Sequence, residues 1–444
     1  MNNPEPTTPS NNEPSNTNHA GKTSIPDNIS EAPAARPSPS DDLYRYVSGP
    51  WLSHHPIPDD RPVDGTFHTL RDQAEEDVNA IIKDADPTTR IGAGFASFMD
   101  VDGDKGVNQA GFAPLKDDLA RINVDNLEDF ARALGELDVV GIGGLAGYYV
   151  AKASDSPIDA AYLNQGGLTL PDEAYYREDA HRPIVDKLKE HIATMFTMAR
   201  DATSGPEWED SPLVPAEFAD ESNEKLAETI IEFETRLAKG HWNVEDTRDA
   251  LKTYNPTSVD DLPTGFPWKT WVEATELSTD TIVVSEPSYL EHVATLAQET
   301  DLSVLKLWAG WQILTQRASL LAEDVSRESF NFYGRVLSGS TEQRARWKRA
   351  VSFLDGSISD DIGREFVARH FPPKHKQKML SLVDYLLKAY RQRISNLDWM
   401  TPDTRDRALE KLGTFRAKIA YPDQWKTYDL SLIHISERAG KADR

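Results

Sequence analysis

The sequence predicts a mainly α-helical protein with many helices in more than one packed lobe. Apolar residues recur at three- and four-residue spacing in several separate segments, which is the period of one face of an α-helix. The chain has 444 residues, whereas single hydrophobic cores stop growing at about 250–300 residues. The sequence shows no fixed-period internal repeat, which argues against a helical-repeat solenoid.

The first residues are predicted to form a disordered tail. Residues 1–41 are rich in Pro, Asn, Ser and Thr and contain no aromatic side chain, so they cannot bury enough apolar surface to offset chain entropy. Order is expected to begin near Leu43. After a proline-rich turn, an amphipathic helix is predicted, with an apolar face made of Phe67, Leu70, Ala74, Val78 and Ile81.

Two further amphipathic helices are predicted in the first half of the chain. The apolar face of one carries Ile184, Leu188, Ile192 and Met195, and that of the other carries Leu226, Ile230, Phe233 and Leu237. The segment 205–223 between them is acidic and contains prolines. It is therefore expected to be an exposed loop or insertion and not a core element.

The second half is also predicted to be helical. The run LSVLKLWAGWQILTQRASLL from Leu302 is apolar on nearly every side, which is typical of a helix buried inside a large body. Ser340 and Gln343 form a capping-box pattern ahead of RWKRAV. A long amphipathic helix is expected between Met379 and Leu397, and Thr401-Pro402 is predicted to begin another.

Composition excludes several classes of function. With 73 acidic against 48 basic residues the formal net charge is -25, which repels phosphate backbones and anionic lipid, so neither nucleic acid nor membrane is an expected partner. The absence of cysteine excludes disulfides, thiolate metal sites and cysteine nucleophiles. No secretory leader and no apolar stretch long enough to cross a bilayer is recognised, so a soluble, cytoplasmic protein is expected.

The histidines do not form a recognisable metal motif. HExxH, which places two imidazoles one helical turn apart beside a carboxylate, does not occur. His54 and His55 are adjacent, and two prolines separate His370 from His375, so neither pair has metal-binding spacing on a helix. All four are interpreted as loop or helix-end histidines, and no metal-ligating or catalytic residue is predicted in this chain.

A glycine motif leaves a dinucleotide-binding enzyme open as an alternative. In LDVVGIGGLAGYYV, Gly141, Gly143 and Ala146 satisfy G-x-G-x-x-A after a strand-like run, and Asp159 lies near the distance expected for a ribose-binding acid. The following segment is turn-rich where that fold needs a crossover helix. The motif therefore leaves a dinucleotide-binding enzyme as one alternative hypothesis among others.

Other motifs are incomplete or missing. DVDGDKG from Asp100 resembles the opening of a calcium loop, but Lys105 replaces the turn glycine and Gly111 stands where the bidentate glutamate belongs. An acidic surface turn is the favoured interpretation. Neither the G-x-S-x-G of serine hydrolases nor the phosphate-binding G-x-x-x-x-G-K-S/T occurs.

An ordered series of longer signatures carries a family resemblance. These are SGPWL from Ser48, QGGLTLPDEAYY from Gln165, RDALKTYNP from Arg248, FYGRVLSG from Phe332, RWKRAV from Arg346, LDWM from Leu397 and KIAYPDQW from Lys418. Together they resemble the N-terminal, largely helical region of the neprilysin and endothelin-converting-enzyme family of zinc metallopeptidases, over residues 42–425. Residues 426–444, which include LSLIHISE, do not follow the family and are interpreted as an atypical tail, with cloning or adapter sequence as the hypothesis.

The resemblance implies a two-lobed metallopeptidase, of which this chain lacks most of the thermolysin-like catalytic lobe. In the complete enzyme it implies zinc, held by ligands outside this chain, and peptide substrates, with a zinc-bound water attacking the peptide carbonyl. Arg71 matches an arginine that contacts the C-terminal side of bound peptide, whereas a second arginine of that subsite corresponds to Val63. The chain alone is predicted to be inactive. Two alternatives stay open. Arg71 could have only a structural role, as an ion pair with Glu75. The chain as a whole could be a non-catalytic helical module that binds peptides or proteins.

Overall fold

The computed structural model describes residues 37–428, which fall in two units divided between Pro58 and Asp59. The predicted tail 1–41 lies outside the described residues except for its last five positions. The atypical tail 426–444 lies outside them except for its first three. Among the described residues, no helix is both long and apolar enough to cross a membrane.

The described part of the first unit contains one helix, α1 (Leu43–His54). Asp42 caps it, because its Oδ1 accepts a hydrogen bond from Arg45 N at 2.8 Å. Trp51 stacks on His55 at the helix end, with ring centroids 4.2 Å apart. Among the described residues, the first helix begins at Leu43, the position near which the sequence predicts order to begin.

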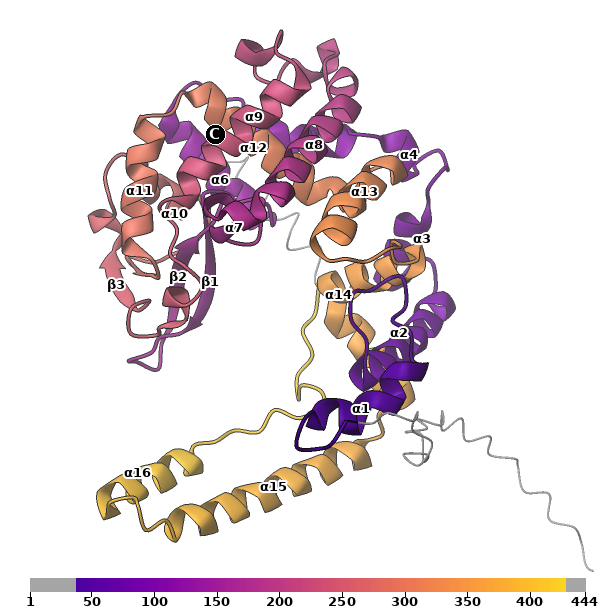
Figure 1. Ribbon diagram of the computed structural model, residues 1–444, viewed down its shortest axis with the longest axis vertical. Coiled ribbons are helices and arrows are strands. Elements are labelled where there is room, and N and C mark those ends of the chain that lie inside the picture. Colours follow the sequence, from indigo (N-terminus) through magenta and orange to yellow (C-terminus); the bar gives the residue numbers. More distant parts are fainter. Residues whose placement is uncertain (1–36, 429–444) are drawn as a thin grey trace, which may run out of the picture. The chain divides into compact units, whose positions relative to one another are not determined.

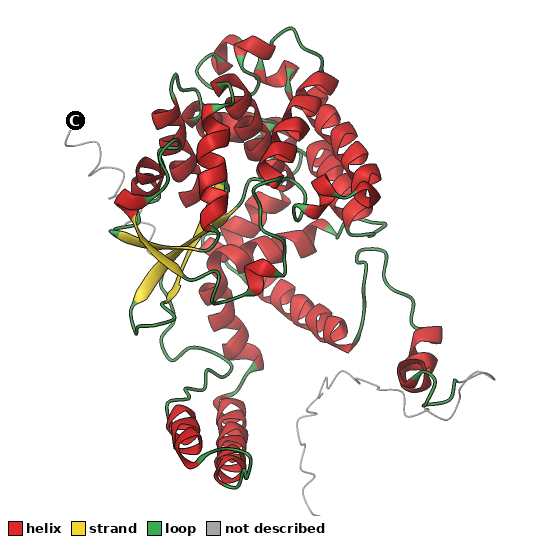
Figure 2. Cartoon of the chain, turned by 60° about the vertical axis from the view of Figure 1, so that its left-hand side comes forward, coloured by secondary structure: helices red, strands yellow, loops and turns green. Residues whose placement is uncertain are grey.

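The described part of the second unit is mostly helical and carries one small sheet (Figures 1 and 2). Its helices are α2 (Thr66–Asp84), α3 (Arg90–Met99), α4 (Val107–Ala110), α5 (Lys116–Arg121), α6 (Leu127–Val139), α7 (Ala174–Arg177), α8 (Arg182–Ala199), α9 (Asn223–Ala238), α10 (Trp268–Ala274), α11 (Pro287–Gln298), α12 (Leu302–Arg317), α13 (Glu323–Phe330), α14 (Arg346–His370), α15 (Pro373–Ser395) and α16 (Pro402–Gly413). Its strands are β1 (Ala146–Lys152), β2 (Asp159–Gln165), β3 (Asn255–Ser258) and β4 (Thr281–Val284). The predicted mainly α class is confirmed.

The larger hydrophobic core is built around α12. The side chains of Trp308 and Trp311 on this helix are fully buried, as are those of Trp268 and Trp271 on α10. Helices α8 and α9 contribute the predicted apolar faces, including Ile192 and other residues that are fully buried. The buried α12 and the two amphipathic helices before it are thus confirmed.

The small sheet has the strand order β1-β2-β4-β3. β1 and β2 form an antiparallel hairpin, β4 runs parallel to β2, and β3 pairs antiparallel with β4. Strand β1 is consequently at one edge of the described sheet. Its face toward α10 is packed by Tyr148, whose ring meets Trp271 edge-on at 6.0 Å.

A second, smaller core joins α2, α3 and α14. It consists of Ile82, Ile91, Val351, Leu354 and Ile362. Helix α14 is interrupted at Ile358, where φ is -133° and ψ is 44°. The helix predicted at Phe67–Ile81 is confirmed as α2, but only its C-terminal half packs, since Phe67 and Leu70 are exposed.

Helices α15 and α16 form a hairpin, yellow in Figure 1. Thr401 caps α16 as predicted, because its Oγ1 accepts from Thr404 N at 3.2 Å. The segment after α16 returns to α14, where Lys426 N donates to Asp360 Oδ1 at 2.8 Å. Trp425 lies against Gly363 of α14. No residue of α15 or α16 is buried.

Two predictions about local structure are wrong. The segment 205–223 is no plain exposed loop, because Trp208 and Leu213 enter the larger core. Ser340 and Gln343 do not form a capping box: α14 begins only at Arg346, and Gln343 Nε2 donates to Ser326 Oγ at 3.2 Å instead. In both cases a tertiary partner decides the conformation, and a short local pattern does not contain that information.

Candidate functional site

Arg71, the residue predicted to contact substrate, lies on α2 with its side chain half exposed. Its Nη2 is 3.6 Å from Asp72 Oδ1. Asp72 is held more closely by Arg61, whose Nη2 donates to Oδ2 at 2.5 Å. A guanidinium carries five N–H donors. Arg71 therefore retains donors that can form hydrogen bonds with the carboxylate of a bound ligand.

The alternative pairing of Arg71 with Glu75 is not formed. Glu75 is buried and accepts a hydrogen bond from Arg344, which precedes α14 in the sequence. Val63, at the position of the second expected arginine, is exposed. Arg61 does not replace that arginine as a free group, because its guanidinium is nearly buried and bound to Asp72.

The histidine pairs noted in the sequence take structural positions. His370 ends α14 and stacks on Phe366 with ring centroids 5.0 Å apart. His375, in the first turn of α15, meets Phe371 edge-on at 5.6 Å. Within residues 37–428, no three His, Cys, Asp or Glu side chains are grouped so that they could hold a metal ion.

The glycine motif lies in the wrong structural context for a dinucleotide. Gly141, with φ of +81°, follows helix α6 and precedes strand β1, whereas the motif requires a strand followed by a helix. Asp159 begins the antiparallel partner strand β2 and pairs with Lys152 across the hairpin at 2.8 Å. The dinucleotide alternative consequently has no support in the fold.

The calcium-like segment is an acidic turn, as favoured from its sequence. Asp100 Oδ1 accepts from Gly103 N at 2.9 Å, and Asp102 Oδ1 accepts from Asn108 Nδ2 at 2.7 Å. These carboxylates thus bond within their own turn and the helix that follows it. The turn connects α3 to α4.

A buried carboxylate, Glu234 on α9, organises the segment that follows β2. It accepts hydrogen bonds from Tyr176 Oη, from Thr169 N at 3.1 Å and Oγ1 at 2.7 Å, and from Gln312 Nε2 at 3.1 Å. Trp311 Nε1 in turn donates to Thr169 Oγ1 at 2.8 Å. One carboxylate therefore ties the QGGLTLPDEAYY signature to α9 and to the central helix α12.

Burial raises the pKa of Glu234 to about 7, and the donors around it oppose that shift. The sequence held an unused signal for this residue. Glu234 stands four residues after Ile230 and three before Leu237, on the apolar face of a predicted helix. A carboxylate at such a position requires buried hydrogen-bond partners.

A cavity of about 430 Å³ adjoins this network at the start of β1. Its walls carry amide, hydroxyl and backbone groups and no charged side chain. They include Ala146 and Gly147 of β1 together with Gln312, Gln316 and Tyr333. Gln316 is fixed by Gly143, because Gly143 N donates to its Oε1 at 2.9 Å and its Nε2 donates to Gly143 O at 3.0 Å.

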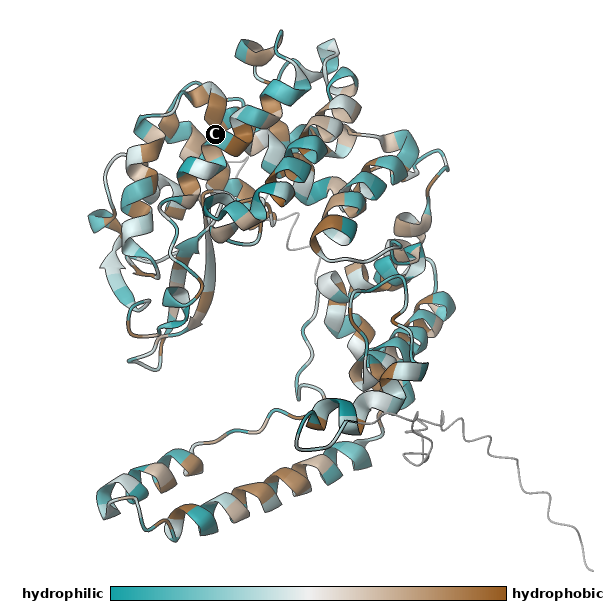
Figure 3. Ribbon diagram, viewed as in Figure 1, coloured by the Kyte–Doolittle hydropathy of each residue, from teal (hydrophilic) through white to brown (hydrophobic). Residues whose placement is uncertain are grey.

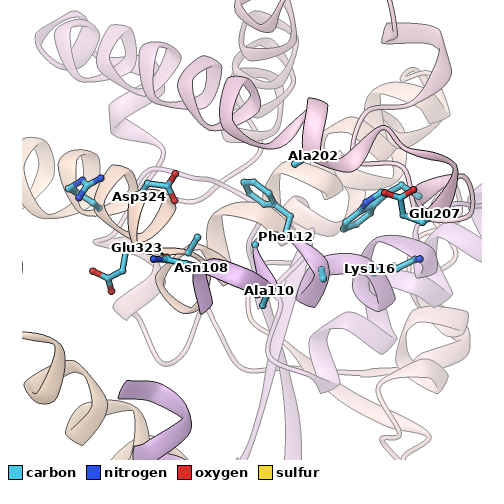
Figure 4. Close-up of a pocket in the computed structure, with 13 residues that line it drawn as sticks. Asn108, Ala110, Phe112, Lys116, Ala202, Glu207, Glu323 and Asp324 are labelled. Atoms are coloured by element: carbon cyan, nitrogen blue, oxygen red, sulfur yellow. Dashed lines mark hydrogen bonds between the residues drawn. The ribbon is translucent and has the colours of Figure 1, made fainter. Parts of the chain in front are cut away.

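A larger cavity of about 850 Å³ lies between the turns at α4 and the start of α13 (Figure 4). In this view Phe112 occupies the middle, with Asp324 to one side and Glu207 and Lys116 to the other. Lys116 Nζ is 5.9 Å from the ring centroid of Trp208. The mixed charges do not define one ligand, and no predicted site residue lies there.

An exposed apolar stripe follows α15 (Figure 3). The side chains of Met379, Leu382, Tyr385, Leu386 and Tyr390 are all exposed. Their spacing places them along the helix at the period of an amphipathic face. Among the described residues nothing buries them, although the sequence pattern is that of a packed helix.

The fold resembles solved zinc metalloproteases. The crystal structure of Mycobacterium tuberculosis zinc metalloprotease Zmp1 in complex with inhibitor matches with a TM-score of 0.78 and 37% identity, over 90% of this chain and 60% of that one. PepO from Lactobacillus rhamnosis HN001 has the same fold, with a TM-score of 0.72 and 22% identity over 88% of this chain. The architecture is therefore that of the N-terminal helical region of a metallopeptidase.

The family follows from the sequence match. The model described as Peptidase family M13 matches residues 39–422, so the chain belongs to that family of zinc metallopeptidases. Neutral endopeptidase of Lactobacillus helveticus is 25% identical over 90% of this chain, and human membrane metallo-endopeptidase-like 1 is 21% identical over 87%. The chain spans 61% and 52% of these two relatives, respectively. The resemblance to the neprilysin family is confirmed.

Proposed function

We propose that this chain is the N-terminal region of a neprilysin-like zinc metalloendopeptidase that acts on peptides, and that it does not cleave them by itself. The match to the family over residues 39–422 carries the proposal. The printed sequence contains no HExxH, and residues 37–428 hold no grouped metal ligands. Zinc binding is accordingly assigned to a lobe that this chain does not supply, and no catalytic step is assigned to its own residues.

The exposed stripe on α15 supports the presence of a partner lobe. Contiguous apolar surface larger than a few hundred Å² is uncommon on isolated soluble proteins and usually marks an interface. The apolar side chains of α15, among them Leu382 and Leu386, are half exposed. In the complete enzyme they pack against the zinc-binding lobe.

A fusion tests this proposal. The chain is produced alone and, separately, with residues 39–422 joined to the remaining part of Zmp1, the part that this chain does not cover. We expect the fusion to bind zinc and to cleave a quenched peptide in a chelator-sensitive manner, whereas the chain alone does neither. A fusion in which the HExxH glutamate is replaced by glutamine is the control. Chelator-sensitive cleavage by the purified chain alone would contradict the proposal.

Arg71 is proposed to bind the C-terminal side of the peptide. Among the described residues, the charged partner of its half-exposed guanidinium is Asp72, at 3.6 Å. In the fusion, Arg71→Ala should raise KM about tenfold, because a charge-assisted hydrogen bond contributes about 1.5–3 kcal/mol. Arg71→Lys, which keeps the positive charge, should raise KM less than Arg71→Ala does. Arg182→Ala, which removes another exposed helical arginine, is the matched control; an equal change in KM for both alanine variants would refute the assignment.

A further inference from the structure

The outer edge of β1 is open. Among the described residues β1 is the terminal strand of the sheet and pairs only with β2. A Cβ built on Gly147 meets no atom within 4 Å, so the face of the sheet at this residue has room for a side chain. The side chains of Tyr149 and Val150 are 47% and 57% exposed.

The register of the hairpin identifies the backbone groups that face outward. Ala153 N donates to Ile158 O at 3.0 Å, so this pair is hydrogen-bonded. In an antiparallel ladder hydrogen-bonded and non-hydrogen-bonded pairs alternate. With Ala151 opposite Ala160 and Tyr149 opposite Tyr162, the groups of Tyr149 and Ala151 point toward β2. Those of Tyr148 and Val150 point away from it.

Among residues 37–428, the N–H and C=O groups of Tyr148 and Val150 therefore have no hydrogen-bond partner and face the outer edge of the sheet. Backbone interactions outside the described helices and strands add no partner for these groups. The next outward carbonyl, that of Lys152, is already taken by Tyr162 Oη at 3.1 Å. Because Ala146 is only 1% exposed, the open part of the edge extends from Gly147 to Val150.

The uncharged cavity lies at the start of this open edge. Ala146 and Gly147 belong both to β1 and to the cavity wall. Beyond them the wall consists of Gln312, Gln316 and other neutral groups. A strand added along β1 would place one of its side chains at this cavity, while the next side chains along it would lie beside Tyr149 and Val150.

We infer that the β1 edge is a peptide-binding site, which holds an extended, proline-free peptide as an added strand. The ligand is uncharged or weakly charged, with apolar or aromatic side chains beside Tyr149 and Val150 and a neutral side chain in the cavity. Main-chain hydrogen bonds provide the affinity of such sites and alternate side chains the specificity. The inference rests on the proposed function only for the choice of peptide as ligand, and it requires neither zinc nor cleavage.

Binding is measured with the purified chain in chelator, by fluorescence anisotropy of a capped, uncharged peptide of alternating Val and Thr with one Gln. The same peptide with its central residue replaced by proline is the ligand control. Saturable binding of the first peptide, with little change as salt is raised, is expected, because the cavity walls carry no charge. Equal binding of the proline peptide would overturn the inference.

Val150→Pro removes one outward donor and leaves the pairing with β2 intact, since proline is tolerated where an edge N–H faces solvent. It should weaken binding about tenfold, the effect of losing one good hydrogen bond. Val150→Thr keeps the N–H and the β-branched shape and should bind as the wild type does. Gly147→Leu, whose Cβ would meet no atom within 4 Å, should also weaken binding by filling the cavity mouth.

Hydrogen exchange locates the bound peptide. The amides of Tyr148 and Val150 should become protected from exchange on binding. Unchanged circular dichroism of each variant is the check on folding.

Binding that is unaffected by both Val150→Pro and Gly147→Leu would reject the site. Self-association that depends on the Val150 N–H would also reject it, because the edge would then pair with a second copy of the chain. Loss of peptidase activity in the fusion would leave this binding result unchanged, so the two proposals fail separately.

Discussion

At the scale of single residues, Glu234 is a buried side chain that accepts four hydrogen bonds. Its carboxylate accepts donors from Tyr176, Thr169 and Gln312, and it is fully buried. A buried charge requires such partners, because desolvation otherwise favours the protonated form. The segment between β2 and α8 thus depends on one ionisable group.

The raised pKa of Glu234 predicts how stability changes with pH. The pKa rises from 4.5 in the unfolded chain to about 7 in the folded one, so the folded state binds the proton more tightly. The stabilisation is complete below pH 4.5 and is lost as the pH rises through 7. Relative to Glu234→Gln, the free energy of unfolding should fall by roughly 3 kcal/mol across this range, at about 1.36 kcal/mol per unit.

Urea unfolding followed by tryptophan fluorescence, at several pH values from 4.5 to 7.5, measures this difference. Glu232→Gln, an exposed change on the same helix, is the control and should leave the pH dependence of wild type unaltered. Parallel profiles for wild type and Glu234→Gln would show that the carboxylate does not titrate as inferred.

At the scale of secondary structure, helical periodicity located most elements. Helices α8, α9 and α12 were predictable because their apolar faces meet a core made by their own neighbours. The start of α16 was predictable because Thr401 caps it through a bond within four residues. A helix can be predicted from sequence when the residues that determine it lie within one turn or along one apolar face.

Elements that depend on distant partners were predicted less well. The capping pattern at Ser340 failed because Gln343 bonds to Ser326 of α13. The strand-like run before Gly141 is helix α6, which packs on α10. The outward groups of β1 follow from the register of a hairpin, and periodicity cannot supply a register.

The candidate site residues also divide into those that a local sequence pattern reveals and those that depend on distant partners. Arg71 was found by resemblance, because it lies in a short matching segment, and its role stays a proposal. Glu234 and the edge of β1 were missed because their importance arises from neighbours remote in sequence, such as Gln312. Glu234 could have been predicted as a site residue only if the packing of α9 against α12 had been known beforehand.

At the scale of the whole molecule, α15 carries an apolar face that the described residues leave exposed. Its exposed apolar side chains, including Leu382 and Leu386, need a surface that residues 37–428 do not provide. Water-exposed apolar stripes of this kind favour association. The chain alone should therefore be poorly soluble and should self-associate, whereas a sharp, reversible melting transition of a monomer would contradict this.

Replacing Leu382 and Leu386 together by glutamine tests what the stripe does. In the chain alone, the change should reduce self-association in sedimentation velocity and leave the melting temperature nearly unchanged, because neither side chain is buried. In the fusion with the zinc-binding part of Zmp1, the same change should destabilise by at least about 2 kcal/mol, the lower range for truncating a buried leucine. Leu251→Gln, at a 91% exposed position away from α15, is the control and should have little effect in either protein. If the double variant is as stable as its parent in the fusion, the α15 stripe does not contact the zinc-binding lobe.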